Sequence, residues 1–371
     1  MQRDGGLRLP HHENARLAGF GSIPAEVWDN GALPVRSLMQ TREWLSAAAE
    51  VYGQGGRTRA LIVGAPDAPK ALALLGRPAP FGGYRLLGAI DVGESVEVMW
   101  ADEASLDQLA RGLTRLGAAV DLGHYPNGAG FAARLRRMQR WRGVTLVRNL
   151  PQRALPALPL TEDWSDPLKL FSRSRRQRFR RKWRKAEAIG PVAVEILSPS
   201  AAELDHQIDR AMAVEAKSWK GRAGTALLQD PKQAAFFRAF GRRMLEKNRL
   251  RLCFLTIGGQ DAAMEYAAVW RNRFWSIKLG YDESFAAVSP GEALRVELMR
   301  HCAQQGYEAI EFCGKEAPWT RAWTDQAVEI QALRLYPWTP RGIAGLASDA
   351  WAAGRRRLQA RRNTMSDQPG A

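Results

Sequence analysis

The sequence predicts a mixed α/β fold, in which mixed sheets and helices form two tandem lobes. Three observations indicate this fold class. Between residues 41 and 150, strand-like runs alternate with helical patterns, which is typical of α/β layers. Between residues 251 and 313, three β-rich runs precede one helix and a further strand. A Pro-rich segment, residues 150–160, separates these regions, because proline neither continues a helix nor suits a central strand.

These patterns divide the chain of 371 residues into four parts. The first 35 residues are rich in Gly, Pro and charge, and we expect an extension that packs loosely. Two lobes follow, at 36–160 and 161–340, the first ending in the Pro-rich joint. The chain is long enough for each lobe to bury a core of its own. Residues 341–371 are a basic tail, at most an amphipathic helix with a disordered end.

The first lobe should begin with a helix from the cap Thr41 to a stop at Gly53. Ser105 caps a second helix, which ends at residue 117. The remaining elements of this lobe are expected as strands at 58–64, 70–77, 95–102, 119–123 and 143–150, and as a helix at 131–141.

The second lobe opens with a basic helix. Nine of the thirteen residues from Arg173 to Lys185 are basic, while Phe179, Trp183 and Ala186 share one face. Such a helix fits either a solvated face anchored by two aromatic residues or a surface for a phosphate-bearing partner. RNA, a nucleotide sugar and an anionic membrane are such partners. RNA is the weakest of these because nucleic-acid surfaces usually carry more aromatic residues for stacking.

Composition excludes several other function classes. The net charge of +16 lies in two patches, since outside residues 173–185 and 355–362 the chain holds 40 basic and 38 acidic residues. Three cysteines without C-x-x-C spacing speak against a disulfide framework, and no His, Cys or carboxylate spacing predicts a metal. No apolar run approaches 20 residues, and no secretory signal opens the chain, so we expect a cytoplasmic protein.

A helix with a strong start signal follows the third β-rich run. Ser289 is a natural N-cap, Pro290 fits the first helical position, and Glu292 completes a capping box. Leu294 begins an apolar repeat at every fourth residue. The Gly291 amide is then bare at the positive end of the helix, where a phosphate group can approach. The same signature also fits an ordinary well-capped helix.

These segments resemble the GNAT acyltransferase superfamily. More narrowly, they resemble the CelD-like (cellulose-biosynthesis-type) acetyltransferase family, which is related to the FemAB aminoacyl transferases. The matching pieces are the basic run before residue 190, WKGRAGTAL at 219–227, KLGYDESFAAVSPGEAL at 278–294, and IEFCG with the downstream AW at 310–323. The resemblance covers about residues 36–340 and implies two GNAT-like lobes. It also implies a coenzyme A pyrophosphate at the helix start, held by Ser289, Pro290, Gly291, Glu292 and Leu294.

Acyl transfer needs a base for the acceptor proton, a donor to the oxyanion and an acid for the thiolate. If the hairpin turn is residues 272–273, Glu265 and Lys278 share a face, whereas a three-residue loop separates them. We expect the first register. Glu265 would then be the base or an acceptor-orienting carboxylate, Lys278 would position an anionic or carbonyl oxygen, and Tyr281 would protonate the thiolate. Glu265 can also be a solvent-facing strand residue.

The acceptor should meet the loop that follows residue 218. A loop with two glycines, two cations and a tryptophan can fold closely around a polar ligand. The resemblance implies that this loop faces the active cleft. The expected substrate-binding residues are Trp219, Lys220, Arg222, Thr225, Asp282 and Trp319.

The resemblance implies transfer of an acetyl or other acyl group from acyl-coenzyme A, without a metal. The acceptor would be an amine or hydroxyl of a sugar or of another cell-envelope or exopolysaccharide precursor. One alternative is FemAB-like aminoacyl transfer, with a charged tRNA docked on the basic helix. Another is a non-catalytic subunit of a polysaccharide biosynthesis system. Nucleic acid is expected only under the first alternative, and the basic segments could add a weak membrane-surface contact.

Overall fold

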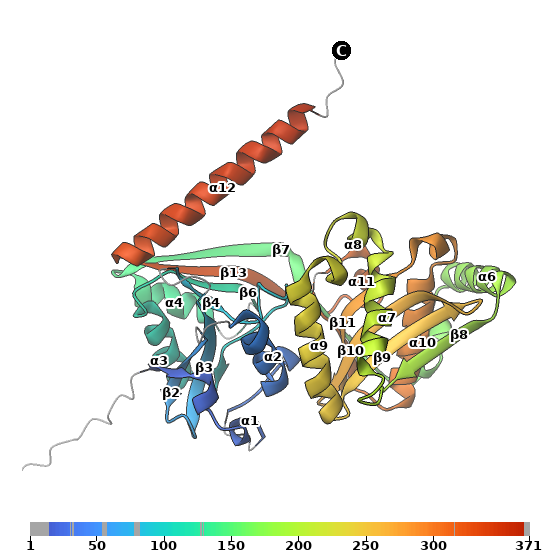
Figure 1. The fold of residues 1–371 in the computed structure, drawn as a ribbon, viewed down its shortest axis with the longest axis horizontal. Coiled ribbons are helices and arrows are strands. Elements are labelled where there is room, and N and C mark those ends of the chain that lie inside the picture. The colour runs from blue at the N-terminus through green and yellow to red at the C-terminus, as the bar shows by residue number, and fades with distance from the viewer. Residues whose placement is uncertain are drawn as a thin grey trace, which may run out of the picture.

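The computed structural model describes residues 15–366 except 30, 32, 54–57, 78–81, 127, 129 and 315. It confirms the mixed α/β fold class. Two lobes lie side by side and are joined by two long strands, β7 (Gly143–Pro159) and β13 (Ala327–Pro337), so that one sheet of 13 strands runs through both lobes (Figure 1). We call the elements before β7 the first lobe and those between β7 and β13 the second lobe.

The elements of the first lobe are β1 (Arg16–Gly19), α1 (Glu26–Asp29), α2 (Arg42–Tyr52), β2 (Arg59–Gly64), β3 (Pro69–Gly76), β4 (Tyr84–Leu86), β5 (Met99–Trp100), α3 (Glu103–Thr114), β6 (Val120–Pro126) and α4 (Phe131–Gln139). Those of the second lobe are α5 (Pro167–Leu170), α6 (Arg173–Ile189), β8 (Val192–Leu197), α7 (Leu204–Ala216), α8 (Trp219–Arg222), α9 (Pro231–Glu246), β9 (Leu250–Ile257), β10 (Gln260–Trp270), β11 (Arg273–Tyr281), α10 (Pro290–Gln304), β12 (Ala309–Phe312) and α11 (Pro318–Arg321). After β13 the chain ends in α12 (Pro340–Ser366).

Both lobes repeat one strand topology. Four strands pair antiparallel in sequence order, β1 to β4 in the first lobe and β8 to β11 in the second. A fifth strand then pairs in parallel with the fourth, β6 beside β4 and β12 beside β11. The strands at the next position are exchanged between the lobes: β13 pairs with β6 of the first lobe, and β7 pairs with β12 of the second. Each lobe is thus completed by the strand that follows the other lobe in the sequence.

The expectation that the Pro-rich joint is not a central strand is wrong, since this segment is the second half of β7. Ala157 donates its N–H to Gln326 beside β13, and Leu160 donates to Glu308 beside β12. Successive residues of a strand direct their backbone N positions to opposite sides. The nitrogen of Pro156 therefore faces β12, beyond the last pair between β12 and β7. The nitrogen of Pro159 faces β13, before the first pair between β13 and β7. Each proline therefore lacks its N–H where no neighbouring strand would accept it.

The sequence signals for helix starts were right in part. Thr41 accepts a hydrogen bond from the Trp44 amide at the start of α2, as expected. The cap of α3 is Asp102 and not Ser105, because the Asp102 carboxylate accepts the Ser105 amide at 2.7 Å. The expected loose packing of residues 1–35 is also corrected for its described part. β1 pairs with β2, and Ile23, Val27, Leu33 and Val35 are buried.

One of the two hydrophobic cores extends across both lobes, so the first lobe does not bury a core separate from the second. One cluster extends from the first lobe to α7 and α9 of the second lobe, while a second cluster lies between the sheet, α6 and α10. At the junction, Trp44 of α2 contacts the rings of Phe236 and Phe240 of α9, with centroids 4.8 and 5.1 Å away. Glu50 and Arg243 pair beside them at 2.7 Å. Residues of the first lobe are therefore held firmly against the second.

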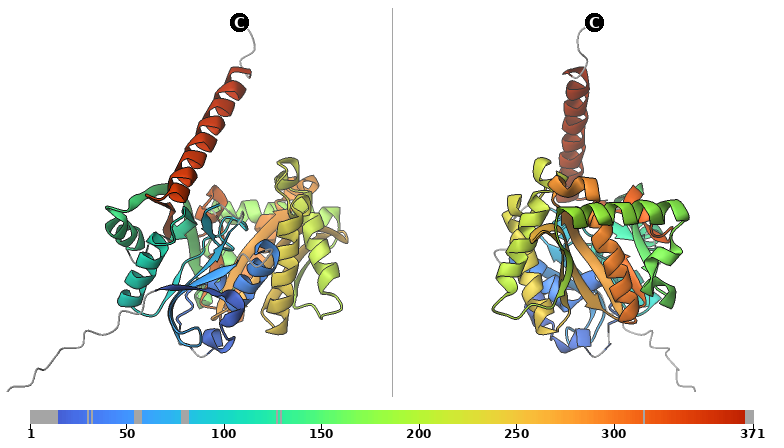
Figure 2. Two further views of the ribbon diagram at one scale, coloured as in Figure 1. Left: turned by 60° about the vertical axis from the view of Figure 1, so that its left-hand side comes forward. Right: turned by 90° about the vertical axis from the view of Figure 1, so that its right-hand side faces the viewer.

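The basic tail forms a long helix, α12, which projects away from the body in every view (Figures 1 and 2). Its first turns rest on the first lobe, where Tyr336 Oη donates to Asp349 at 2.7 Å and Arg334 pairs with the same carboxylate at 2.9 Å. Across residues 15–366, apart from the gaps given above, no helix is long and apolar enough to span a bilayer.

Candidate active site

The parallel pair β11 and β12 separates part-way along β11. The register runs from Arg273 beside Ala309 to Ser276 beside Phe312, and one more hydrogen bond joins the Cys313 amide to the Ser276 carbonyl at 3.1 Å. β11 then continues to Tyr281, whereas β12 has ended. The last residues of β11, 277–281, therefore have no neighbouring strand on this side among the described segments, which leaves a free sheet edge inside the second lobe.

The hairpin before this edge corrects the expected register. Its turn residues are Arg271 and Asn272, both with positive φ, 48° and 55°, as in a type I′ turn. A bulge between residues 266 and 267 then shifts the pairing. Tyr266 lies opposite Lys278, and Glu265 lies opposite Leu279. Glu265 and Lys278 are consequently on opposite faces of the sheet and do not form the expected pair.

Glu265 is held in a buried ion pair beneath α10. Its carboxylate accepts two contacts from the Arg295 guanidinium, at 2.8 and 2.9 Å, and both side chains are at most 5% exposed. Arg295 also donates to Ser276 Oγ at 3.1 Å. Burial raises the pKa of Glu265, and the Arg295 charge opposes that rise. This geometry makes Glu265 a partner in a buried ion pair and not a solvent-facing residue, while its role as an acceptor base stays a prediction.

Lys278 lies on the other face, where the two lobes meet. Its Nζ is 3.6 Å from a carboxylate oxygen of Glu94, which comes from the first lobe between β4 and β5. Beside it, Lys220 Nζ donates to Glu215 Oε1 at 2.7 Å and to the Leu279 carbonyl at 2.8 Å. We call Glu94, Glu215, Lys220 and Lys278 the junction cluster. Two carboxylates and two ammonium groups thus lie beside the free edge of β11.

Glu94 is a buried carboxylate of the junction cluster with a shifted pKa. Burial raises its pKa, while Lys278 and the Gly314 amide oppose the rise. Its side chain is 3% exposed, and Oε2 has no hydrogen-bond partner among the described residues. Burial also lowers the pKa of Lys220. Groups with such shifted pKa values are typical of acid–base sites. Sequence reasoning missed Glu94, because nothing in its local pattern shows that it reaches the second lobe.

The substrate-binding residues expected after position 218 diverge. Only Lys220 turns inward to the junction cluster. Trp219 is 55% exposed, and Arg222 pairs with Glu283 at the surface. Thr225 is exposed and donates weakly to the Lys220 carbonyl at 3.4 Å. The expected wrapping loop is mostly the short helix α8, so its role in acceptor binding stays a prediction.

The other two expected contacts frame the edge of β11 from opposite ends. Asp282 accepts the Ser284 amide at 2.9 Å and pairs with Lys217 at 3.1 Å, as a turn residue does. Trp319 lies edge-on to Phe312, and the Arg295 guanidinium is 5.6 Å from its ring centroid. Neither side chain contacts the junction cluster in the described interactions.

The start of α10 differs from the expected capping box. The backbone of Ser289 lies in the left-handed region (φ 52°), and its side chain accepts no hydrogen bond from a backbone amide of the helix. Its Oγ instead accepts Lys182 Nζ of α6 at 2.6 Å, and the Glu292 carboxylate lies 3.7 Å from both Lys182 and Arg175. The cations of α6 therefore replace the backbone as partners of these side chains. Pro290 does occupy the first helical position, and Leu294 is buried as expected.

Gly291 leaves space at this helix start. Its amide makes no backbone hydrogen bond within the described part of the chain. Among the described residues, a Cβ placed on it would meet only the Tyr281 ring, at an ordinary 3.5 Å. Tyr281 therefore lies beside the helix start, on the face opposite Lys278. The three expected catalytic residues occupy three places: a buried ion pair, the lobe junction and the α10 start.

The cysteines offer no alternative chemistry. Cys253, Cys302 and Cys313 are free, and burial raises the pKa of each thiol. Among the described residues, no three His, Cys, Asp or Glu side chains are grouped to hold a metal ion.

Comparisons with known proteins bear on the fold of the second lobe. Residues 173–321 fit the family model described as acetyltransferase (GNAT) domain. A conserved protein of unknown function from Bacteroides thetaiotaomicron VPI-5482 is similar in structure, with a TM-score of 0.53 and 12% identity over 85% of this chain and 98% of that one. FemX is similar with a TM-score of 0.54 and 11% identity, over 85% and 96% of the two chains. A search of curated proteins found no match. The second lobe thus carries a GNAT-type acyltransferase fold.

Proposed function

We propose that the protein transfers an acyl group from an acyl-coenzyme A to an amine or hydroxyl of a small precursor, such as a sugar of the cell envelope. One arrangement carries this proposal. A parallel strand pair opens between a helix start with a bare amide and a cluster of titratable groups from both lobes. A thioester that enters along the free edge of β11 would have its phosphates on one face and its carbonyl near the other.

The donor's diphosphate would bind at the start of α10. The Gly291 amide, the positive end of the helix and the Lys182 ammonium all favour a phosphate there. The Glu292 carboxylate already lies 3.7 Å from Lys182, so a bound phosphate would compete with it for that cation. Arg175, also 3.7 Å away, would remain as the partner of Glu292.

The junction cluster supplies groups for the transfer itself. Glu94, as a carboxylate, would accept the proton that the acceptor loses as its nitrogen or oxygen attacks the thioester carbonyl. The Lys278 ammonium would stabilise the negative charge on the carbonyl oxygen. As the C–S bond breaks, the thiolate would take up the proton that Glu94 has accepted, because Tyr281 lies on the other face of the sheet, beside the diphosphate site. Because Glu94 belongs to the first lobe, the acceptor would bind at the lobe junction.

Aminoacyl transfer is the second candidate. The structural similarity to FemX over 85% of this chain favours it, as does the basic helix α6 next to the proposed donor site. A charged tRNA would then replace acyl-coenzyme A as the donor, and its phosphates would contact the exposed arginines of α6.

A weak membrane contact through α12 would suit an envelope precursor as acceptor. Ile343, Trp351 and Leu358 are 52–64% exposed and lie on one side of the helix, within about 80° at 100° per residue. Arg355 and Arg357 are exposed beside this apolar stripe. An apolar face with flanking cations is typical of helices that lie on an anionic membrane surface.

A thermal-shift screen separates these candidates. Acetyl-coenzyme A at a hundred times its dissociation constant should stabilise the folded protein by about 2.7 kcal/mol. Aminoacyl transfer predicts instead micromolar binding of charged tRNA that falls steeply with salt concentration. No stabilisation by any acyl-coenzyme A and no tRNA binding would leave only a non-catalytic subunit of a polysaccharide system.

A further inference from the structure

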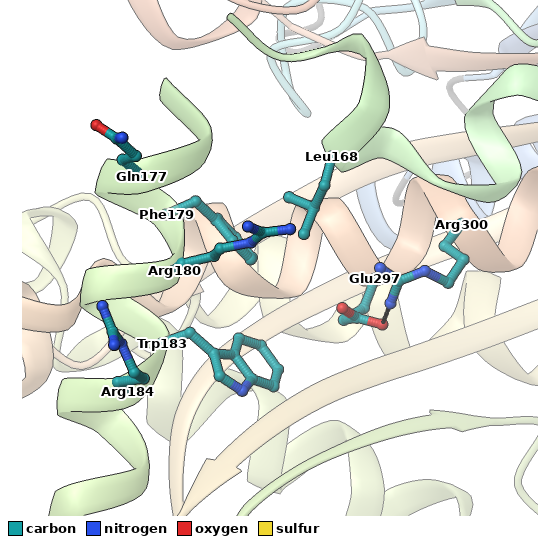
Figure 3. Close-up of a pocket in the computed structure, with 8 residues that line it drawn as sticks. All are labelled: Leu168, Gln177, Phe179, Arg180, Trp183, Arg184, Glu297 and Arg300. Carbon is teal, nitrogen blue, oxygen red and sulfur yellow. Dashed lines mark hydrogen bonds and ion pairs between the residues drawn. The ribbon is translucent and has the colours of Figure 1, made fainter. Parts of the chain in front are cut away.

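A groove of about 620 Å³ lies between α6 and α10, next to the proposed diphosphate site. From α6, Arg180 and Trp183 extend toward α10, where Glu297 and Arg300 pair with each other (Figure 3). Leu168 of α5 closes one end. The groove lies on the outer side of these helices, away from the junction cluster.

The lining of the groove carries more positive charge than its ion pairs neutralise. Arg180 and Arg184 are exposed and have no ion-pair partner among the described residues. Arg300 is paired with Glu297, so the lining holds three guanidinium groups and one carboxylate. Two cations in a concave site are therefore available to an anion, and arginine binds phosphate with two parallel hydrogen bonds.

The groove also presents a fixed aromatic ring. Trp183 is stacked on the buried Phe179, with ring centroids 5.9 Å apart and planes at 27°. Its indole N–H donates to Glu187 at 2.9 Å, which fixes the second rotation of the ring. Phe179 covers one face of the indole, so a flat ligand can stack on the other.

The groove lies within reach of the proposed diphosphate site. Lys182, which contacts the start of α10, and Trp183 are neighbours on α6. Along α10, Glu297 follows Glu292 by five residues, or about 7.5 Å at 1.5 Å per residue. A ligand whose diphosphate binds at Gly291 can therefore reach the groove with its next sugar and base.

We propose that this groove binds the 3′-phosphorylated adenosine of coenzyme A, with the adenine on Trp183 and the 3′-phosphate between Arg180 and Arg184. This assignment rests on the proposed acyl-coenzyme A donor and adds a residue set that selects it. It also gives a function to the half-buried Trp183 and to two exposed arginines of α6.

The test compares coenzyme A with 3′-dephospho-coenzyme A by isothermal titration calorimetry. The wild type should bind coenzyme A roughly tenfold or more tightly than the dephospho form, since the latter lacks the charge that the two arginines bind. The double variant Arg180→Ala/Arg184→Ala should bind both ligands with nearly equal affinity. Arg181→Ala removes a neighbouring exposed cation that does not line the groove, and should keep the preference.

Equal binding of both ligands by the wild type, or a preference that survives in the double variant, would overturn the proposal. Adenosine 3′,5′-bisphosphate distinguishes this failure from failure of the proposed donor. If coenzyme A does not bind but the bisphosphate binds and loses affinity in the double variant, the groove takes a phosphorylated adenosine from another donor. If neither ligand binds, both the groove assignment and the donor are wrong.

Discussion

Replacing Arg295 by methionine should strongly destabilise the protein, because it leaves a carboxylate in the core without its cation. In the structure, Arg295 contacts both oxygens of Glu265, at 2.8 and 2.9 Å, and the two side chains are 5% and 3% exposed. Removing one partner of such a buried pair costs about 3–5 kcal/mol. That is a large share of the roughly 5–15 kcal/mol by which domains are stable.

The loss should depend on pH in a definite direction. Burial raises the pKa of Glu265 even with Arg295 present, and the variant lacks the opposing charge. A carboxyl group with a raised folded-state pKa destabilises the fold once the pH exceeds its unfolded value of about 4.3. The free energy of unfolding of Arg295→Met, relative to wild type, should therefore fall further at pH 8 than at pH 5.

Urea unfolding at these two pH values measures the effect, and Glu265→Leu/Arg295→Met is the matched control. The double variant removes both charges and should recover most of the lost stability, because no lone charge stays buried. A single variant as stable as wild type would refute the reasoning. So would a Glu265→Gln variant that keeps its stability but loses activity, since that result would restore Glu265 as a catalytic base.

Two further predictions concern the junction cluster and α12. Glu94→Gln should abolish the acidic limb of the pH–rate profile; in the wild type this limb should lie above the range of an ordinary carboxyl, because burial raises the pKa of Glu94. An unchanged profile would remove Glu94 from the mechanism. Trp351→Ala/Leu358→Ala should weaken sedimentation with vesicles of phosphatidylglycerol, while added salt weakens the wild type as well. Equal sedimentation of both proteins would contradict a role for the apolar stripe, and equally strong binding to neutral vesicles would contradict a role for its flanking cations.

Local signals in the sequence predicted the fold class, the basic helix α6 and the order of strands and helix from β9 to β12. Thr41 at the start of α2 and Pro290 at the first position of α10 act through neighbouring backbone groups, so their patterns suffice. The exchange of β7 and β13 was not predictable in this way. It depends on which distant strand lies beside Pro156 and Pro159, and proline alone indicates only that a hydrogen bond is missing.

The candidate site was harder to predict because it depends on register and on the other lobe. One bulge in the β10–β11 hairpin moved Glu265 to the face opposite Lys278. Glu94 joins Lys278 only because the two lobes pack together, and no spacing in the sequence encodes that contact. Similarly, Ser289 and Glu292 fit a capping box, but cations of α6, more than 100 residues earlier in the chain, attract both side chains.

The most direct test of the account is the affinity of acetyl-coenzyme A for Gly291→Glu compared with Gly291→Ala. The Cβ that both variants add has room in the folded protein, since among the described residues it would meet only the Tyr281 ring, at 3.5 Å. A bare amide that binds a diphosphate predicts that alanine nearly preserves the affinity. Glutamate, which brings both bulk and negative charge, should abolish binding while the melting temperature without ligand stays unchanged. Undiminished binding by the glutamate variant would contradict a donor site at the start of α10.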